Sequence, residues 1–273
     1  MSIVVITIPG SAKEAFVTRL NQETKGKVEL VLVQKWKPDS YGNQLKRLSK
    51  KGFFHLLEEL WCALLLRLLP ATRKTLNYFR EGNLVPKSVH TPKTVVVSDI
   101  NSDEVFSMIK KISPDLLVVW GSKILAPRLI GTAKRAVNLH MGRCPYYRGT
   151  LANQLAVLEN DRAHIGATVH YVEEHVDAGP ILTVISPDLT RAPRALFRDL
   201  NDRAQATYID IVSRLVRGEN MQSVPQDETK GKNLLMREWT PYVRYHVARE
   251  MRRWECEYEK EGKTSTVAVE AEG

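Results

Sequence analysis

The strongest constraint on the fold is an alternation of apolar, strand-like runs with a helical run at the start of the chain. Ile3 to Thr7 and Val28 to Gln34 are short and nearly continuous in apolar residues, and they flank a helical stretch from Lys13 to Thr24. Asp115 to Trp120 is a third such run and should be central in the sheet, because strands covered on both faces are apolar throughout. The order predicts an α/β protein with a Rossmann-like, open, mostly parallel sheet.

The same patterns continue toward the C-terminus. Further strands are expected at Thr94 to Val97, Arg135 to His140 and Ile181 to Ser186, and helices at Asp103 to Ile112 and Ala192 to Arg217. We therefore expect one α/β domain over residues 1–218 and a small C-terminal extension over residues 219–273. The extension should hold a charged helix from Tyr242 to Tyr258, followed by a flexible tail from Lys260.

Composition is ordinary for a globular protein: of 273 residues, 43% are hydrophobic and 26% charged. The first residues lack the leader of a signal peptide, so we expect a cytoplasmic protein without a transmembrane segment. Cys62, Cys144 and Cys256 are too far apart to indicate a disulfide framework or a zinc site. The net charge of +9 favours an anionic partner, although a merely solvated basic surface is commoner, and no compact nucleic-acid module is visible.

Three side chains could carry out acyl transfer to an amine. Asn138 and His140 are two apart on a predicted strand and therefore point to the same face, near the strand end where open α/β sheets bind ligands. Asp177 follows in a loop. An amide, an imidazole and a carboxylate can stabilise an oxyanion, handle the proton of the amine and orient the imidazole. A purely structural, hydrogen-bonded histidine is an equally good interpretation of Asn-x-His alone.

The surrounding residues resemble a known family. The stretches Val137 to Gly149 and Ile165 to Leu182, within a match over roughly residues 93–217, resemble the folate-dependent formyltransferases. These include glycinamide ribonucleotide formyltransferase, methionyl-tRNA formyltransferase and the sugar N-formyltransferases. The resemblance implies the formyltransferase fold and metal-free transfer of a formyl group from 10-formyltetrahydrofolate to a primary amine. It places the catalytic roles on Asn138, His140 and Asp177.

The resemblance also implies two sets of binding residues. Contacts to the folate are expected from Ser122, Ile124, Leu125, Val176 and Gly179. Contacts to the acceptor are expected from Gly10 and Ser11, in the turn that binds the acceptor phosphate in glycinamide ribonucleotide formyltransferase. Tyr146, Tyr147 and Arg148 are candidates only by their position after the catalytic strand. Simpler interpretations stay open: Ser122 can cap a helix, the turn at Gly10 can be a plain tight turn, and the two tyrosines can be buried.

The chain departs from the family pattern after the histidine. Relatives often continue into an aliphatic run, whereas Arg143 and Cys144 stand here, so the shape and polarity of the loop on the acceptor side should differ. Cys144 lies close to His140, and such a pair can form a nucleophile. Formyl transfer to an amine needs no covalent enzyme intermediate, which argues against that role.

Residues 36–92 form an insertion that the compact relatives do not match. Within it, Phe53 to Pro70 is strongly apolar, with a narrow polar stripe at helical spacing made of His55, Glu58, Glu59 and Cys62. Glu58, Glu59 and Arg67 argue against a membrane span. We expect the apolar face to pack on the catalytic domain or in a homodimer. Binding at a membrane surface, helped by Lys46, Arg47, Lys50 and Lys51, or to a foreign partner is the alternative.

The acceptor is the open part of this interpretation. A nucleotide-linked amino sugar fits the basic charge, the expected compartment and the lack of evenly spaced strands after residue 218. Glycinamide ribonucleotide, a hydroxyornithine-type precursor and methionyl-tRNA are alternatives. A non-enzymatic protein that binds a partner through the insertion is the contrasting hypothesis; it gives no reason for all three catalytic groups to be present.

Overall fold

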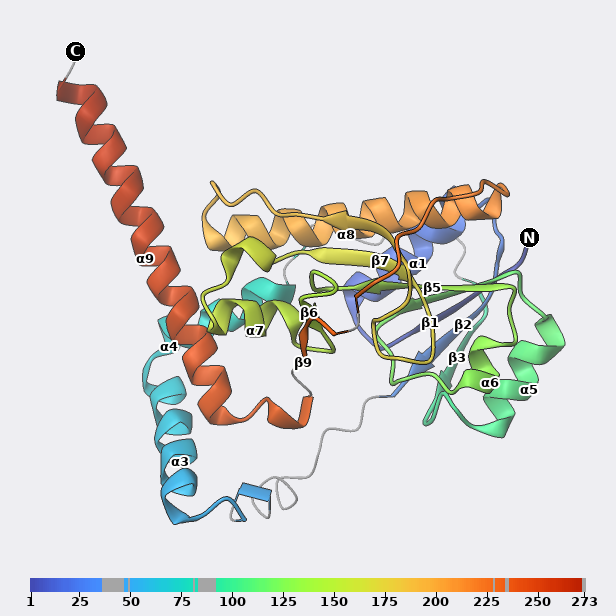
Figure 1. Cartoon of the computed structure of the whole chain (residues 1–273), viewed down its shortest axis with the longest axis horizontal. Helices are drawn as coiled ribbons and strands as arrows, with labels where there is room; N and C mark the ends of the chain where they lie inside the picture. Colours follow the sequence, from blue (N-terminus) through green and yellow to red (C-terminus); the bar gives the residue numbers. More distant parts are fainter. Residues whose placement is uncertain are drawn as a thin grey trace.

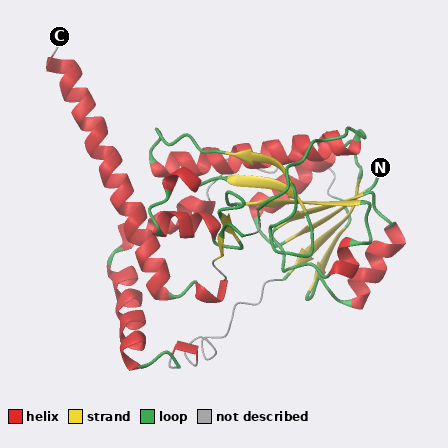
Figure 2. Cartoon of the chain, viewed as in Figure 1, coloured by secondary structure: helices red, strands yellow, loops and turns green. Residues whose placement is uncertain are grey.

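A single seven-stranded sheet forms the centre of the molecule, with helices on both faces (Figures 1 and 2). The computed structural model describes residues 1–35, 47–48, 50–80, 82, 92–227, 229–233 and 236–271; side chains are described to residue 261. The strand order is β3-β2-β1-β4-β5-β7-β8. The strands are β1 Ile3–Thr7, β2 Val28–Gln34, β3 Thr94–Val97, β4 Leu116–Trp120, β5 Arg135–His140, β7 Ala167–Tyr171 and β8 Ile181–Ile185.

The first five of these strands are parallel, and β7 and β8 add an antiparallel edge. One face of the sheet packs against α1 (Ser11–Glu23) and α8 (Pro193–Val216). The other face packs against α5 (Asp103–Ile112) and α6 (Pro127–Ile130). Residues of β1 alternate between the two cores: Ile3 and Val5 face α1 and α8, and Val4 and Ile6 face α5 and α6. The predicted α/β class is therefore confirmed.

Most predicted elements lie within two residues of their expected ends. β3, α5 and β5 have the predicted bounds, whereas β4 begins at Leu116, β8 ends at Ile185, and α8 ends at Val216. Short elements complete the frame: β6 Tyr147–Arg148 pairs with β9 Lys232–Asn233, beside α7 Ala152–Leu158, η2 Arg162–His164 and η3 Met236–Glu238.

The main helix of the insertion packs on the protein through the side opposite to the expected apolar face. Its described part contains α3 (Phe53–Leu68), α4 (Pro70–Lys74) and η1 (Thr75–Arg80); residues 36–46, 49, 81 and 83–91, including Lys46, lie outside the described residues. α3 turns part of its polar stripe inward: Glu59 and Cys62 are buried against the neighbouring α9, while Glu58 and Trp61 are exposed. The expectation that the apolar face packs on the catalytic domain is wrong for the described residues.

A hydrogen bond explains this orientation. The Glu59 carboxylate accepts from the backbone N–H of Tyr242 at 2.7 Å, in the first turn of α9 (Pro241–Ala271). The first N–H groups of a helix lack partners within the helix, and the helix dipole favours a negative charge there. His55 lies 3.5 Å from the same carboxylate. Glu59 is therefore turned inward to cap α9.

The C-terminal helix α9 joins the main core at its start and then projects from the molecule (Figure 1). Val247, Met251 and Trp254 are buried, and Trp254 meets Phe197 of α8 edge to face with centroids 6.3 Å apart. The helix expected at Tyr242 is confirmed. It continues to Ala271, through the segment predicted to be a flexible tail. Among the described residues, no helix has the length and apolar character needed to span a membrane.

Tyr208 joins α8 to the sheet beside the end of β5, the strand that carries Asn138. Its buried hydroxyl accepts from Val119 N–H at 3.1 Å and lies 2.8 Å from the carbonyl of Val137, to which it can donate. Burial raises the pKa of Tyr208 well above its usual value, so the hydroxyl keeps its proton. The side chain thus joins the backbones of β4 and β5.

Replacing Tyr208 by Phe should lower the free energy of unfolding by about 1 to 3 kcal/mol, because buried main-chain groups lose a partner. Urea unfolding followed by circular dichroism measures this, with Tyr258→Phe as the control because Tyr258 is 37% exposed. Equal stability of the Tyr208→Phe variant and the wild type would contradict this bridging role.

Candidate active site

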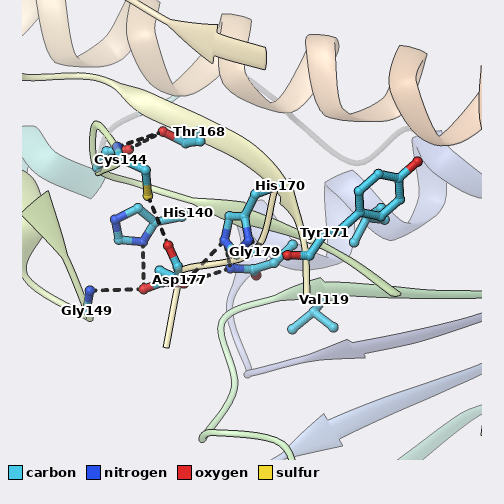
Figure 3. Close-up of polar contacts among 12 residues, drawn as sticks. Val119, His140, Cys144, Gly149, Thr168, His170, Tyr171, Asp177 and Gly179 are labelled. Atoms are coloured by element: carbon cyan, nitrogen blue, oxygen red, sulfur yellow. Dashed lines mark hydrogen bonds and ion pairs between the residues drawn. The ribbon is translucent and has the colours of Figure 1, made fainter. Parts of the chain in front are cut away.

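The end of β5 and the neighbouring β7 bring the imidazoles of His140 and His170 to the same site (Figure 3). The amide of Asn138 lies beside them. Asn138 and His140 both lie on β5, and Asn138 is directly opposite His170 in the antiparallel pair with β7. Asn138 Nδ2 is 3.1 Å from His170 Nε2. The sequence expectation that Asn138 and His140 share a face is supported by their common partner, Asp177.

Asp177 lies between the two imidazoles in the loop that joins β7 to β8 (Figure 3). Its Oδ2 is 3.2 Å from His140 Nδ1 and accepts from the Gly149 N–H at 2.9 Å. Its Oδ1 accepts from Asn138 Nδ2 at 3.2 Å and is 3.4 Å from His170 Nε2. Both carboxylate oxygens are therefore bound to groups that can donate.

The backbone of Asp177 is left-handed, with φ of 50°. Aspartate tolerates this region better than most residues because its short side chain can bond locally. Gly179, two residues on, allows the loop to return onto β7, since a Cβ there would lie 2.0 Å from the Tyr171 carbonyl oxygen. Any larger residue at 179 would push the Asp177 loop away from the strand.

His140 is held at both ring nitrogens. Nε2 is 3.0 Å from the Tyr147 carbonyl, and Nδ1 faces the Asp177 carboxylate. Both neighbours are acceptors, so a ring that donates to both carries two protons and a positive charge. Gly142 leaves the ring its space, because a Cβ at that residue would lie 2.3 Å from Nε2.

Opposing effects set the charge of Asp177. Burial raises the pKa of the carboxyl, but His140 and His170, with the Gly149 N–H, lower it more, and the pKa lies well below its usual range. The carboxylate is therefore ionised at neutral pH. An ionised group with only 13% of its side chain exposed is a strong local source of electric field.

Cys144 supports the loop and is not positioned as a nucleophile. Its N–H donates to Thr168 Oγ1 at 3.1 Å, and its thiol donates to the Asp177 carbonyl at 3.4 Å. Burial, together with the charge of Asp177, raises the pKa of Cys144 to about 12, so the reactive thiolate is scarce. Arg143 points elsewhere and donates to the Ala163 carbonyl at 3.1 Å.

The residues predicted to contact the folate lie in two segments. Ser122, Ile124 and Leu125 follow the end of β4, the strand beside β5; Ile124 is 65% exposed and Leu125 is buried in the α5–α6 core. The Ser122 hydroxyl donates to the Lys123 carbonyl at 2.7 Å. Val176 and Gly179 flank Asp177 in the β7–β8 loop. The two segments thus follow β4 and β7, the strands on either side of β5.

The residues predicted to contact the acceptor are more scattered. Gly10 and Ser11 form the exposed start of α1, where no side chain caps the helix. Tyr146 is 40% exposed and stacks on His164. The Tyr147 side chain is buried, and its hydroxyl bonds Glu159 and Asp161 at 2.8 Å, so only its carbonyl reaches His140. Arg148 donates to the Lys230 carbonyl at 3.2 Å.

Three groups at the site were not predicted from the sequence. In the sequence, His170 is one histidine within an apolar strand. The pairing of β7 with β5 brings it to Asn138. Gly149 contributes a backbone N–H, which side-chain patterns do not report. Gln226, from the C-terminal extension, donates to the carbonyls of Asp177 at 3.0 Å and Gly179 at 2.6 Å.

Comparison with known proteins agrees with this geometry. The family model described as "Formyl transferase" matches residues 1–212. A methionyl-tRNA formyltransferase from Chlorobium chlorochromatii (strain CaD3) is 28% identical over 138 residues, which cover 49% of this chain and 43% of that protein. The chain thus spans less than half the length of this curated relative.

Two solved structures share the fold. A sugar N-formyltransferase from Shewanella sp FDAARGOS_354 has a TM-score of 0.54 and 15% identity, covering 91% of this chain and 88% of that one. A sugar 3N-formyl transferase solved in the presence of dTDP and 5-N-formyl-THF has a TM-score of 0.51 and 12% identity, covering 90% and 78%. With the family model matched over residues 1–212, the chain belongs to the formyl transferase family.

Proposed function

We propose that this chain transfers a formyl group from 10-formyltetrahydrofolate to a primary amine. The observation that carries the proposal is the convergence of Asn138 and His140 on the buried, ionised Asp177, each within 3.2 Å. An amide donor, a positive charge and a carboxylate in one site are the groups that acyl transfer to an amine requires.

The proposed place for the folate is the segment that follows β4. The segment from Gly121 to Leu125 follows β4, beside the strand that ends in His140, and it exposes the apolar side chain of Ile124. Gly121 has a left-handed φ of 77°, which turns the chain sharply after the strand. An exposed apolar residue beside polar backbone suits a flat heteroaromatic ring. The folate supplies the activated formyl group; the chain supplies position and charge.

Each catalytic residue has a separate role in this proposal. Asn138 carries two N–H groups, which now face His170 and Asp177, and a formyl oxygen takes over one of these bonds. His140 places a positive charge beside the oxygen as it becomes negative. Direct donation from its Nε2 would need exchange of the bond to Tyr147. Asp177 holds both donors and orders a water. As the amine nitrogen bonds to the formyl carbon and the bond from that carbon to N10 of the folate breaks, this water relays the proton lost by the amine to N10.

For the acceptor we propose an amino sugar linked to a nucleotide. The N-terminus of α1 is uncapped at Gly10 and Ser11, and such a terminus presents N–H groups suited to a phosphate. The net charge of +9 also favours an anionic acceptor. The two structures described above are of sugar formyltransferases. Methionyl-tRNA is the second candidate, because the curated relative acts on it according to its name.

Asn138→Ala and His140→Ala should each lower turnover roughly 100-fold to 1000-fold, because each removes a stabilising group for the developing negative charge. Mass spectrometry of the acceptor, after incubation with 10-formyltetrahydrofolate and a panel of nucleotide-linked amino sugars, measures the added formyl mass. The exposed Asn77→Ala serves as control. Near-normal turnover in either site variant, with a folded protein, would remove that residue from the mechanism.

Asp177→Asn should lower turnover similarly and reduce stability in a pH-dependent way. The folded-state pKa of Asp177 lies below the usual value near 4, so its charge stabilises the fold above about pH 4, and this contribution disappears as the pH falls toward the folded-state pKa. At pH 7 the free energy of unfolding of the Asp177→Asn variant should therefore be about 2 to 3 kcal/mol lower than that of the wild type. The difference should shrink below about pH 4.

Chemical unfolding of both proteins between pH 7 and pH 3 measures the effect. A difference in stability that stays constant over this range would mean that Asp177 acts through its shape and not its charge.

A further inference from the structure

Helix α3 exposes a continuous apolar stripe. Its members recur at intervals of three and four residues and therefore share one side of the helix. Phe54 is 82% exposed, Phe53 70%, Leu68 62% and Trp61 59%. The α3 stripe is defined here as Phe53, Phe54, Leu57, Leu60, Trp61, Leu64 and Leu68, each at least 43% exposed. Contiguous exposed apolar surface of this kind marks an interaction site.

The stripe cannot turn inward without loss of the contacts on the other side of the helix. Glu59, 2% exposed, bonds the Tyr242 N–H of α9, and Cys62 and Leu66 are buried on the same side. Rotation of α3 would leave a buried carboxylate and a helix terminus unpaired, which is costly. The outward direction of the stripe is therefore part of the fold.

Basic residues stand at both ends of the stripe. Arg47, Lys50 and Lys51 precede it, and Arg67, Arg73 and Lys74 lie at its end or just beyond; all six are exposed. From residue 50 to residue 74 the acidic residues are Glu58 and Glu59, and Glu59 is buried. Both ends of the stripe are thus basic, and Glu58 is the exposed acidic residue between them.

This charge pattern distinguishes between occupants. In a symmetric pair of copies, either direction of helix packing places a basic end of one α3 beside a basic end of the other, and like charges repel. A surface with negative charge over an apolar interior is complementary both to the basic residues at the two ends of the stripe and to its apolar side chains. Trp and Phe on one side of a helix, with Lys and Arg beside them, are typical of helices that lie in a lipid interface.

We propose that the α3 stripe binds the surface of a membrane that contains anionic lipids. The helix lies parallel to the surface, and its Phe, Trp and Leu side chains enter the boundary between headgroups and acyl chains. The basic residues at the two ends of the stripe contact lipid phosphates. The proposal is independent of formyl transfer, because it uses none of the residues at the Asp177 site.

Sedimentation with vesicles tests the proposal on the full chain. The wild type should bind vesicles in which phosphatidylcholine is mixed with the anionic lipid phosphatidylglycerol, and should bind pure phosphatidylcholine much more weakly. Trp61→Glu and Phe54→Glu should each weaken binding at least about tenfold, since each replaces a large apolar group by a charge. Leu189→Glu, at a 45% exposed leucine between β8 and α8, is the matched control.

A second variant tests the contribution of charge separately from that of apolar contact. It remains informative even if Trp61→Glu and Phe54→Glu fail to fold. Lys50→Gln combined with Lys51→Gln should weaken binding to the anionic vesicles roughly fivefold for each lysine, and added salt should have a similar effect. Circular dichroism confirms that all variants fold.

Three results would overturn the proposal. They are a wild type that does not sediment with anionic vesicles, stripe variants that bind as well as Leu189→Glu, and a wild type that light scattering shows to be a dimer while Trp61→Glu is a monomer. The last result would assign the stripe to a second copy of the chain.

Discussion

The buried Asp177 carboxylate is the interaction on which the rest of the site depends. It joins the end of β5, the neighbouring β7 and the Gly149 turn, and every side chain proposed for the chemistry touches it. Burial of a charge is costly unless donors surround it. Here His140 and the Asn138 amide face the carboxylate, the Gly149 N–H donates to it, and His170 Nε2 lies 3.4 Å from it. The group that orders the site therefore also supplies its electrostatics.

The scaffold around this carboxylate is built in layers. Gln226 and Cys144 hold the Asp177 carbonyl, and Gly179 lets the loop pass close to β7. Tyr208 joins the backbones of β4 and β5 one residue before Asn138. Gln226 belongs to the C-terminal extension, so residues beyond the α/β frame help to position the loop. The domain boundary at residue 218 stays a prediction. The contact between Gln226 and the Asp177 carbonyl shows that residues on both sides of this boundary hold the Asp177 loop.

Local patterns predicted the frame well and long-range contacts poorly. β3, α5 and β5 were expected with their observed bounds, because apolar periodicity is encoded in neighbouring residues. Asn138 and His140 follow from the period of a strand. His170 does not, since only the antiparallel pairing of β5 with β7 brings it there. The direction of α3 was wrong for a similar reason: Glu59 caps a helix that begins 182 residues later in the chain, at Pro241.

A structure of the chain with a non-transferring analogue of 10-formyltetrahydrofolate would show where the formyl group binds. We expect the formyl oxygen to lie about 3 Å from Asn138 Nδ2, in place of one of its present partners, with His140 beside it. Asp177 should keep its bonds to His140 and Gly149. A formyl group bound away from Asn138 and His140, or a folate bound at another part of the chain, would contradict the account.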